Sequence, residues 1–332
     1  RKEGPMLQTR LTDFFGCRLP IVAGGLHWLS NADYVAAAAR AGIMGFITAA
    51  SFPEPKRLRE EIRRCRDLAD GRPFGVNVSM LPKLVPGDAA DATFDLIADE
   101  GVKFVETAGR NPEPYLPRLR AAGVKVVHKV PTVKHAVKAQ SVGVDMVEVI
   151  GAEAGGHPGV ELVGTMVQGA LAADRLTVPL AVGGGIATGR QLVAALALGA
   201  DGVLIGTRFL VAEEIWAHPN FKERLIAADE TSTDLIMQSL RNTLRALKNE
   251  TTETVRRLEA AHPGDLAALM PYISGKAGRA AYETGDVSKG ALSVGQSVAF
   301  ADRVEPLADI VARIEAEALA TLARLKNLAG SA

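Results

Sequence analysis

Cysteine and aromatic residues are scarce in this chain of 332 residues, and neither sign of charge is in excess. The 2 cysteines, Cys17 and Cys65, are too few for a disulfide framework or a cysteine metal cage, and they suit a reducing compartment. Aromatic residues make up 5%, which disfavours a surface that stacks nucleic-acid bases. Lys and Arg number 38 and so do Asp and Glu, without a long block of like charge. We therefore expect no nucleic-acid partner.

Long apolar runs and several motifs are also missing. No run of about 18 apolar residues occurs, so we expect no transmembrane helix and no membrane partner. Residues 1–6 lack the apolar stretch of a signal peptide, and we expect a cytoplasmic protein. Neither an HxH nor an HExxH spacing is present, so we expect no metal site.

The chain does contain a repeated phrase, in which a glycine is followed at once by an apolar, β-rich run. Copies begin at Gly42, Gly101, Gly123, Gly143 and Gly199. Such a glycine suits the left-handed position after a helix, and such a run suits a parallel strand that is buried on both faces. The phrase therefore predicts alternating helices and strands.

Between the copies lie amphipathic stretches, each preceded by a residue that suits a helix N-cap: Asn31, Thr132 and Thr188. We predict strands at 19–24, 44–49, 74–79, 104–109, 125–130, 145–151, 179–184 and 201–206. Eight βα units indicate an α/β protein with a (β/α)8 TIM barrel. The rival is a doubly wound open sheet, but its GxGxxG signature after the first strand is absent.

The βα rhythm stops after the eighth strand. We interpret residues 1–210 with 301–332 as the barrel, and 211–300 as a mostly helical insertion or cap, with helical text from Thr231 to Glu259. A final amphipathic helix at about 304–327 should close the barrel.

In such a barrel, the active site forms at the carboxyl ends of the strands and in the loops that follow. The loops after the seventh and eighth strands carry Gly183, Gly184, Gly185, Gly206 and Thr207. Barrels commonly bind phosphate with these two loops, where backbone N–H groups and a hydroxyl are available. The glycines could instead serve only tight turns. Because both loops carry the pattern, we favour a phosphate site.

Polar side chains stand at the ends of the third, fourth and fifth strands: Asn77, Glu106 and Lys129. An inward lysine needs a partner, since a buried lone ammonium is costly. A flavin ring or a phosphate could be that partner, and so could the Glu106 carboxylate in a purely structural pair. Asn77 could hydrogen bond a ring edge or cap a turn, and the residues alone do not decide.

The loop after the sixth strand combines glycines with one titratable imidazole, in Gly155, Gly156 and His157. Histidine suits proton transfer near neutral pH, and the glycines let the backbone approach a ligand. A loop histidine satisfied by a carbonyl is the alternative, but the position at the barrel mouth favours catalysis. Glu153 could simply brace the loop.

Together these motifs resemble the nitronate monooxygenase family, formerly called 2-nitropropane dioxygenases, from Pro20 to about Leu325. The resemblance includes a bacterial NADH:quinone reductase branch, and flavin-dependent enoyl-acyl-carrier-protein reductases share the scaffold. It implies FMN at the mouth, with its phosphate on the glycines of the last two loops and on Thr207, and with Asn77 and Lys129 on the ring or ribityl chain. Ala23, Gly24 and Gly25 would lie beside the isoalloxazine, and His157 would face the substrate.

The chain also departs from the family's usual residues. Leu26-His27 stands where Met-Gln is frequent, Gly183 stands where the family has serine, and Ala154 replaces a cysteine of the quinone-reductase branch. FMN binding could therefore be retained while the substrate side differs.

Three reactions stay open for the small-molecule substrate: oxidation of a nitronate with O2, reduction of a quinone, or reduction of an enoyl thioester. The last two use NADH or NADPH. A flavin-binding protein without activity is the non-enzyme alternative. A thioester would need a cationic entrance, for which Arg208, Lys248 and Lys276 are candidates. A homodimer is left open as the assembly.

Overall fold

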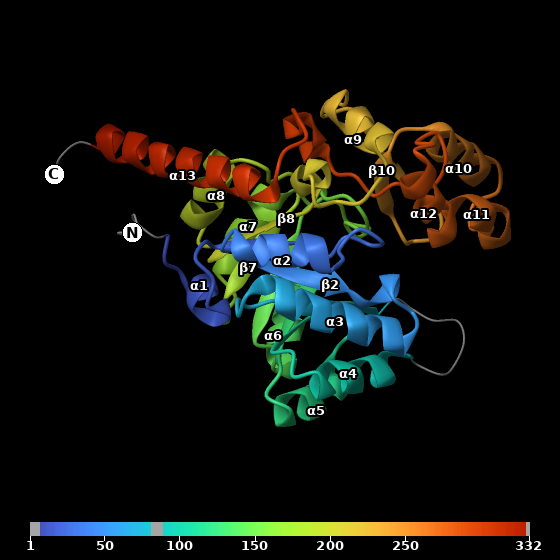
Figure 1. The fold of residues 1–332 in the computed structure, drawn as a ribbon. Coiled ribbons are helices and arrows are strands. Elements are labelled where there is room, and N and C mark those ends of the chain that lie inside the picture. The colour runs from blue at the N-terminus through green and yellow to red at the C-terminus, as the bar shows by residue number, and fades with distance from the viewer. Residues whose placement is uncertain (1–6, 81–88, 330–332) are drawn as a thin grey trace.

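The computed structural model describes residues 7–80 and 89–329 and has a closed barrel of eight parallel strands (Figure 1). Each strand pairs with the next along the chain, and β1 closes the ring against β8. The strands are β1 (Ile21–Ala23), β2 (Met44–Thr48), β3 (Gly75–Met80), β4 (Phe104–Gly109), β5 (Lys125–Val130), β6 (Met146–Ile150), β7 (Leu180–Gly183) and β8 (Gly202–Ile205). This confirms the (β/α)8 prediction, and all eight strands fall inside or within one residue of their expected ranges.

The helices around the barrel begin and end as the sequence signals indicate. They are α2 (Ala32–Arg40), α3 (Pro55–Ala69), α4 (Ala89–Asp99), α5 (Leu116–Ala121), α6 (Val133–Val142), α7 (Thr165–Ala173) and α8 (Gly189–Ala197). The side chains of Asn31, Thr132 and Thr188 each accept a hydrogen bond from a backbone N–H of the first turn, as N-caps do. The five repeat glycines all have φ between 67° and 96°, which lets the chain turn directly into the next strand.

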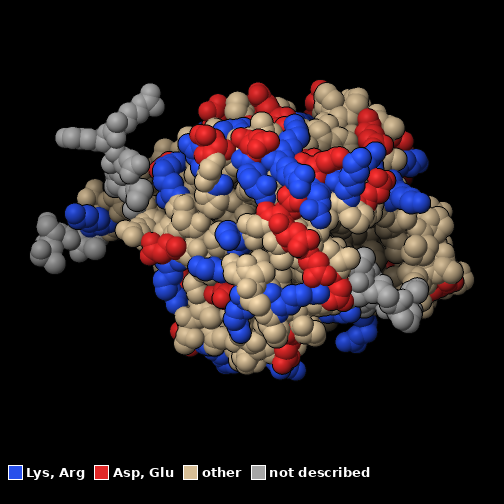
Figure 2. Space-filling model, turned by 60° about the horizontal axis from the view of Figure 1, so that its bottom comes forward, with Lys and Arg blue, Asp and Glu red and all other residues tan. Residues whose placement is uncertain are grey.

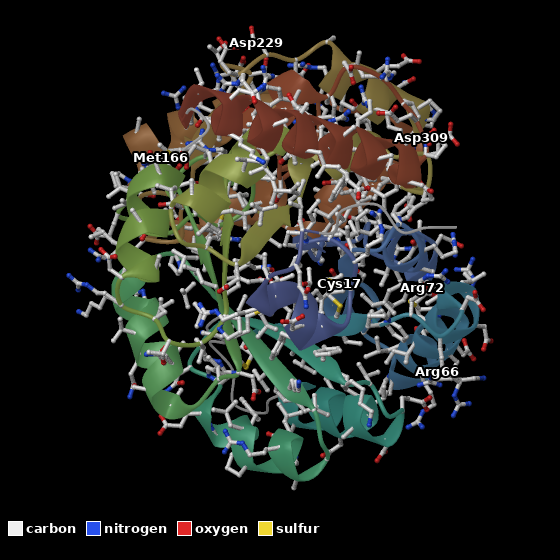
Figure 3. The ribbon with its side chains drawn as sticks, turned by 90° about the vertical axis from the view of Figure 1, so that its left-hand side faces the viewer. Cys17, Arg66, Arg72, Met166, Asp229 and Asp309 are labelled. Atoms are coloured by element: carbon white, nitrogen blue, oxygen red, sulfur yellow. The ribbon has the colours of Figure 1, made fainter. Side chains whose placement is uncertain are left out.

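The short helix α1 (Arg10–Phe15) covers the amino-terminal end of the barrel (Figure 3). Its Leu11 and Phe15 join a buried cluster with inward residues of the strands, including Phe46 and Phe104. The Phe15 and Phe104 rings lie 5.1 Å apart, edge to face. Because this end is filled with apolar side chains, only the carboxyl end of the barrel offers a polar mouth.

The segment between β8 and the last helix is an insertion that lies to one side of the barrel (Figure 1). It contains α9 (Pro219–Ile226), β9 (Thr233–Ile236), β10 (Leu244–Leu247), α10 (Glu250–Ala261), α11 (Leu266–Ile273) and α12 (Gly275–Thr284). The helical prediction for Thr231–Glu259 is wrong in its first half, where β9 and β10 form an antiparallel hairpin. The apolar and polar residues of this segment follow neither a clear helical nor a clear strand period, so the pattern alone did not distinguish a strand from a helix. The domain boundaries at 210 and 301 stay a prediction.

The last helix, α13 (Leu307–Ala329), packs against α8 and α2. It therefore closes the helical ring, as expected, beside the first barrel helix. In the face that Figure 2 presents, blue and red side chains are interspersed, without a broad field of one sign. None of the helices in the described ranges combines the length and apolarity needed to cross a membrane.

Both cysteines are unpaired thiols, as the sequence suggested. Cys17 lies close to the end of α1, where Figure 3 labels it, and burial raises its pKa to about 12. Cys65 is buried in α3, and burial raises its pKa as well. Neither thiol is therefore a ready nucleophile at neutral pH.

Candidate active site

Strand periodicity defines a ring of residues at the carboxyl end of the barrel. Apolar side chains fill the barrel interior at one level, among them Phe104, Val127 and Met146. Since side chains of a strand alternate between faces, the residues two positions further on also point inward. On β3 to β6 this ring holds Asn77, Glu106, Lys129 and Glu148. On β2 it holds Thr48, at the end of β7 it holds Gly183, and directly after β8 and β1 it holds Gly206 and Gly24. The half of the ring that runs from β2 to β6 is polar, and the other half lacks side chains.

The polar half is a connected group around Glu106, which is fully buried. Lys129 Nζ lies 3.1 Å from Glu106 Oε2, and the same oxygen accepts a hydrogen bond from Asn77 Nδ2. Burial alone would lower the pKa of Lys129, but Glu106 and Glu148 outweigh it and raise that pKa above its ordinary value. Lys129 is therefore a fixed ammonium. Lys129 does form the structural pair with Glu106. Its side chain is nevertheless 18% exposed, so it can still contact a ligand.

Glu148 is a site residue that the sequence reasoning missed. It is fully buried and lies beside Lys129 in the β5–β6 register. Burial, and then the neighbouring Glu106, raise its pKa well above the ordinary value. The sequence signal for an inward glutamate was its place in an otherwise apolar strand, two residues after the inward Met146. The glycine repeat predicted the strand but not which of its residues face the barrel interior.

The glycine half of the ring supplies unused backbone donors. Outside the segments left undescribed, no residue accepts a hydrogen bond from the backbone N–H of Gly184, Gly185 or Gly206. Thr207 is buried, and its hydroxyl oxygen accepts the Gly295 N–H at 2.9 Å, which leaves its own O–H free to donate. A Cβ at Gly206 would meet only Leu26, at 3.5 Å, so this side is open. The donors suit an anion such as a phosphate.

The turn after β1 lies against the polar half. A Cβ added to Gly25 would come within 2.9 Å of the Asn77 side chain, so the backbone passes directly over that amide. Gly24 donates its N–H to Ile205 O at 2.9 Å, which joins the first and last strands. The Ala23 side chain instead packs in the layer between strands and helices, so Ala23 can contact a ligand only through its backbone.

His157 lies on the loop after β6, and its side chain is exposed to solvent. No side chain or carbonyl in the described part of the chain hydrogen bonds its imidazole. Although the side chain is open to solvent, desolvation by the surrounding protein atoms, and then the charge of His27, lower the pKa of His157 below its ordinary value. The imidazole is therefore neutral at neutral pH and able to accept a proton.

The His157 loop is held on two sides by residues that bond its backbone. Glu153 accepts the Thr165 N–H at 3.1 Å and the Thr165 hydroxyl at 2.9 Å, so it braces the loop against the start of α7. Arg245 of β10 exchanges two backbone hydrogen bonds with Gly156, at 2.7 and 3.0 Å, and its Nε donates to Ala152 O at 3.0 Å. The insertion thus positions the histidine loop, which no local pattern had indicated.

Two further polar side chains, His128 and Arg208, are engaged by neighbouring residues of the protein and are not available to a ligand. His128 points away from the interior and shares a 2.8 Å hydrogen bond with the Thr107 hydroxyl, and burial lowers its pKa to about 4. Arg208 is buried against Asp302 and Glu305, each at 3.3 Å, so it cannot serve as the cationic entrance expected of it. Within the described ranges, no cluster of His, Cys, Asp or Glu is arranged to hold a metal ion.

Comparisons with known proteins agree with this architecture. The family model described as nitronate monooxygenase matches residues 8–93 and 83–317. A 5-hydroxy-7a-methyl-1-oxo-octahydro-1H-indene-4-carboxyl-CoA dehydrogenase from Rhodococcus jostii is 34% identical over 266 residues, covering 80% of this chain and 71% of the relative. A probable nitronate monooxygenase from Staphylococcus saprophyticus is 30% identical, covering 74% of this chain and 79% of the relative.

A solved structure extends the likeness to the fold. The structure of FabK from Thermotoga maritima superposes with a TM-score of 0.88 at 31% identity, covering 97% of this chain and 99% of that one. The family match spans most of the barrel and the insertion, which are the parts that form the mouth. This chain belongs to the nitronate monooxygenase family and is an enzyme of the oxidoreductase type.

Proposed function

We propose that the barrel mouth binds FMN and that the chain oxidises alkyl nitronates with O2. The observation that carries this proposal is the divided ring of the mouth. Its glycine half has free N–H donors, and its polar half ends in a fixed ammonium. A flat anionic cofactor needs both an open surface and donors, and this half-ring offers them together.

Different residues of the mouth would bind the phosphate and the ring of FMN. The phosphate would be bound by the N–H groups of Gly184, Gly185 and Gly206 and by the Thr207 hydroxyl, none of which needs to break an existing bond. Asn77 and Lys129 would hydrogen bond the ring or ribityl chain, with Gly24 and Gly25 beside the ring. The flavin supplies electron transfer, and the protein supplies binding and orientation.

His157 is the proposed proton-handling residue. Its neutral, unbonded imidazole can take the proton from the carbon next to a nitro group, or hold a nitronate that is already anionic. Glu153 and Arg245 fix the loop backbone on either side, so the imidazole is held in place without being consumed in a bond of its own. Such positioning of a base is worth about 10²–10⁴ in rate.

A second candidate is reduction of an enoyl thioester with NADH or NADPH. It is supported by the Rhodococcus relative, whose name specifies a carboxyl-CoA substrate, and by the 0.88 TM-score to FabK. In this reaction His157 would donate a proton to the carbon beside the thioester carbonyl. A quinone as the acceptor of electrons from NAD(P)H stays a third possibility.

Three measurements test the proposal. Purified protein should bind FMN on titration, and a protein that takes up no FMN would refute the cofactor assignment.

Anaerobic mixing with NADH or NADPH should leave the flavin oxidised in a nitronate oxidase. Bleaching of the flavin would favour a reductase, which would then be assayed on quinones and enoyl-CoA thioesters. His157→Ala should lower turnover on every accepted substrate while the exposed His262→Ala does not, and equal turnover of the two variants would refute the catalytic role.

A further inference from the structure

Two carboxyl groups of the polar half of the mouth are buried inside the barrel. Glu106 on β4 and Glu148 on β6 both have 0% exposure, and Lys129 on β5 separates their strands. Asn77 and Lys129 both bond Glu106 Oε2. That leaves Glu106 Oε1 and both Glu148 oxygens without a partner in the described part of the chain.

Those three oxygens are closed off from solvent. Each has almost no accessible surface, so no water-sized space touches them. An unpaired buried carboxylate is costly, and two of them side by side would add their mutual repulsion. Glu106 and Glu148 are both fully buried and lie on β4 and β6, on either side of the strand that carries Lys129, and the charge of Glu106 acts on Glu148. The two groups can therefore satisfy each other, provided that one of them carries a proton.

The charges that face Glu148 come from two neighbouring elements. Lys129 on β5 contributes a positive charge and Glu106 on β4 a negative one, while the register partner on β7 is Ala181, which has no charge. Asn77 on β3 is polar but neutral. With one proton shared between the carboxyls, the group carries one negative and one positive charge and is neutral. Without that proton it carries a net negative charge inside a closed barrel.

We propose that Glu106 and Glu148 share a single proton at neutral pH, and that Glu148 is a positioning residue which keeps the Lys129 ammonium directed at the mouth. The second half of this proposal rests on the proposed function, because it concerns how the mouth binds FMN. A protonated Glu148 donates to Glu106 and does not compete for Lys129. An ionised Glu148 would draw the ammonium towards β6 and repel an anionic ligand above it.

The proton itself can be tested without any cofactor. The flavin-free protein at neutral pH should have the infrared carbonyl band of a protonated carboxylic acid. That band should shift in D2O, disappear in Glu148→Gln, and persist in a control variant at an exposed glutamate of α9, Glu223→Gln. A wild-type protein without such a band, or a Glu148→Gln variant that retains it, would overturn the shared proton. The wild-type measurement decides the matter even if the variant does not fold.

The positioning role is tested by FMN affinity across pH. Wild-type affinity should fall by on the order of tenfold as alkaline pH removes the shared proton, since a net negative charge then lies beneath an anionic ligand. Glu148→Gln has no proton to lose and retains a donor towards Glu106, so its affinity should stay flat as pH rises. The same alkaline loss in both proteins would overturn the positioning role. If no FMN binds at all, the proposed function fails while the infrared result still stands.

Discussion

Replacing Lys129 with methionine removes the ammonium from a buried group while keeping a side chain of similar length and apolar character. The 3.1 Å contact between Lys129 Nζ and Glu106 Oε2 corresponds to about 5 kcal/mol of attraction at an effective dielectric constant of about 20. Loss of one member of a buried pair typically destabilises by about 3–5 kcal/mol, because the other charge remains buried. We therefore expect Lys129→Met to lower the free energy of unfolding by about 3–5 kcal/mol at pH 7.

Urea unfolding at pH 7 and pH 5 measures this change. Protonation neutralises a buried carboxylate that has lost its ammonium partner, so the penalty should shrink as pH falls. The double variant Lys129→Met with Glu106→Gln should lose about 2–3 kcal/mol less than the sum of the single losses, because it removes both charges.

Two results would refute this reasoning. A loss below about 1 kcal/mol would mean that Lys129 and Glu106 behave as an exposed surface pair. Additive losses in the double variant would mean that the two side chains do not depend on one another, and then the ammonium at the mouth would need another explanation.

Further predictions concern the histidine loop and the glycine half of the mouth. Because the pKa of His157 lies below its ordinary value of about 6.5, kcat/KM should stay constant down to about that pH and fall only below it, and an acid limb above pH 7 would count against His157 as the base. Gly184→Ala and Gly123→Ala both place a side chain at positive φ, 104° and 70°, which by itself costs about 1–2 kcal/mol in urea unfolding, and Gly184→Ala should cost more because its Cβ also clashes with neighbouring atoms. Only Gly184→Ala should also weaken FMN binding, since its Cβ would lie 2.7 Å from Thr165 Oγ1 while the Cβ at Gly123 meets nothing, and equal FMN affinities would contradict the phosphate site. Arg245→Met removes the bond to Ala152 O, so unfolding should become about 1.5–3 kcal/mol easier and kcat should fall more than FMN affinity, whereas an unchanged kcat would show that the loop does not need this bond.

The fold was predictable because its signals are local. Five glycines that follow helices and three N-caps that precede them mark the βα alternation, and each acts within a few residues of its own position. The hairpin of β9 and β10 was not predictable in this way. Its strands are four residues long, which is too short for the alternation of a strand to be recognised beside the helical pattern of the flanking residues.

The candidate site was only partly predictable. The glycines and Thr207 of the last two loops, Asn77, Lys129 and His157 could be named because their residue types are unusual at strand ends. Glu148 could not, since a glutamate within a strand reads equally well as a residue on a solvated face. Arg245 was hidden for a different reason: its partners, Ala152 and Gly156, are far away in the chain, so its role exists only after the insertion has folded back.

The amino-acid sequence by itself determined the barrel, the order of its strands, the end at which polar residues gather and the family to which the chain belongs. These follow from periodicity and from turn residues, which depend on near neighbours. Tertiary structure decided which polar groups touch. Closing the ring and setting its register placed Glu106, Lys129 and Glu148 on three consecutive strands and buried Arg208 in an ion pair, and among the described residues the His157 imidazole has no hydrogen-bond partner. Burial and partnership are properties of the closed barrel, and they determine which of the predicted residues are free to do chemistry.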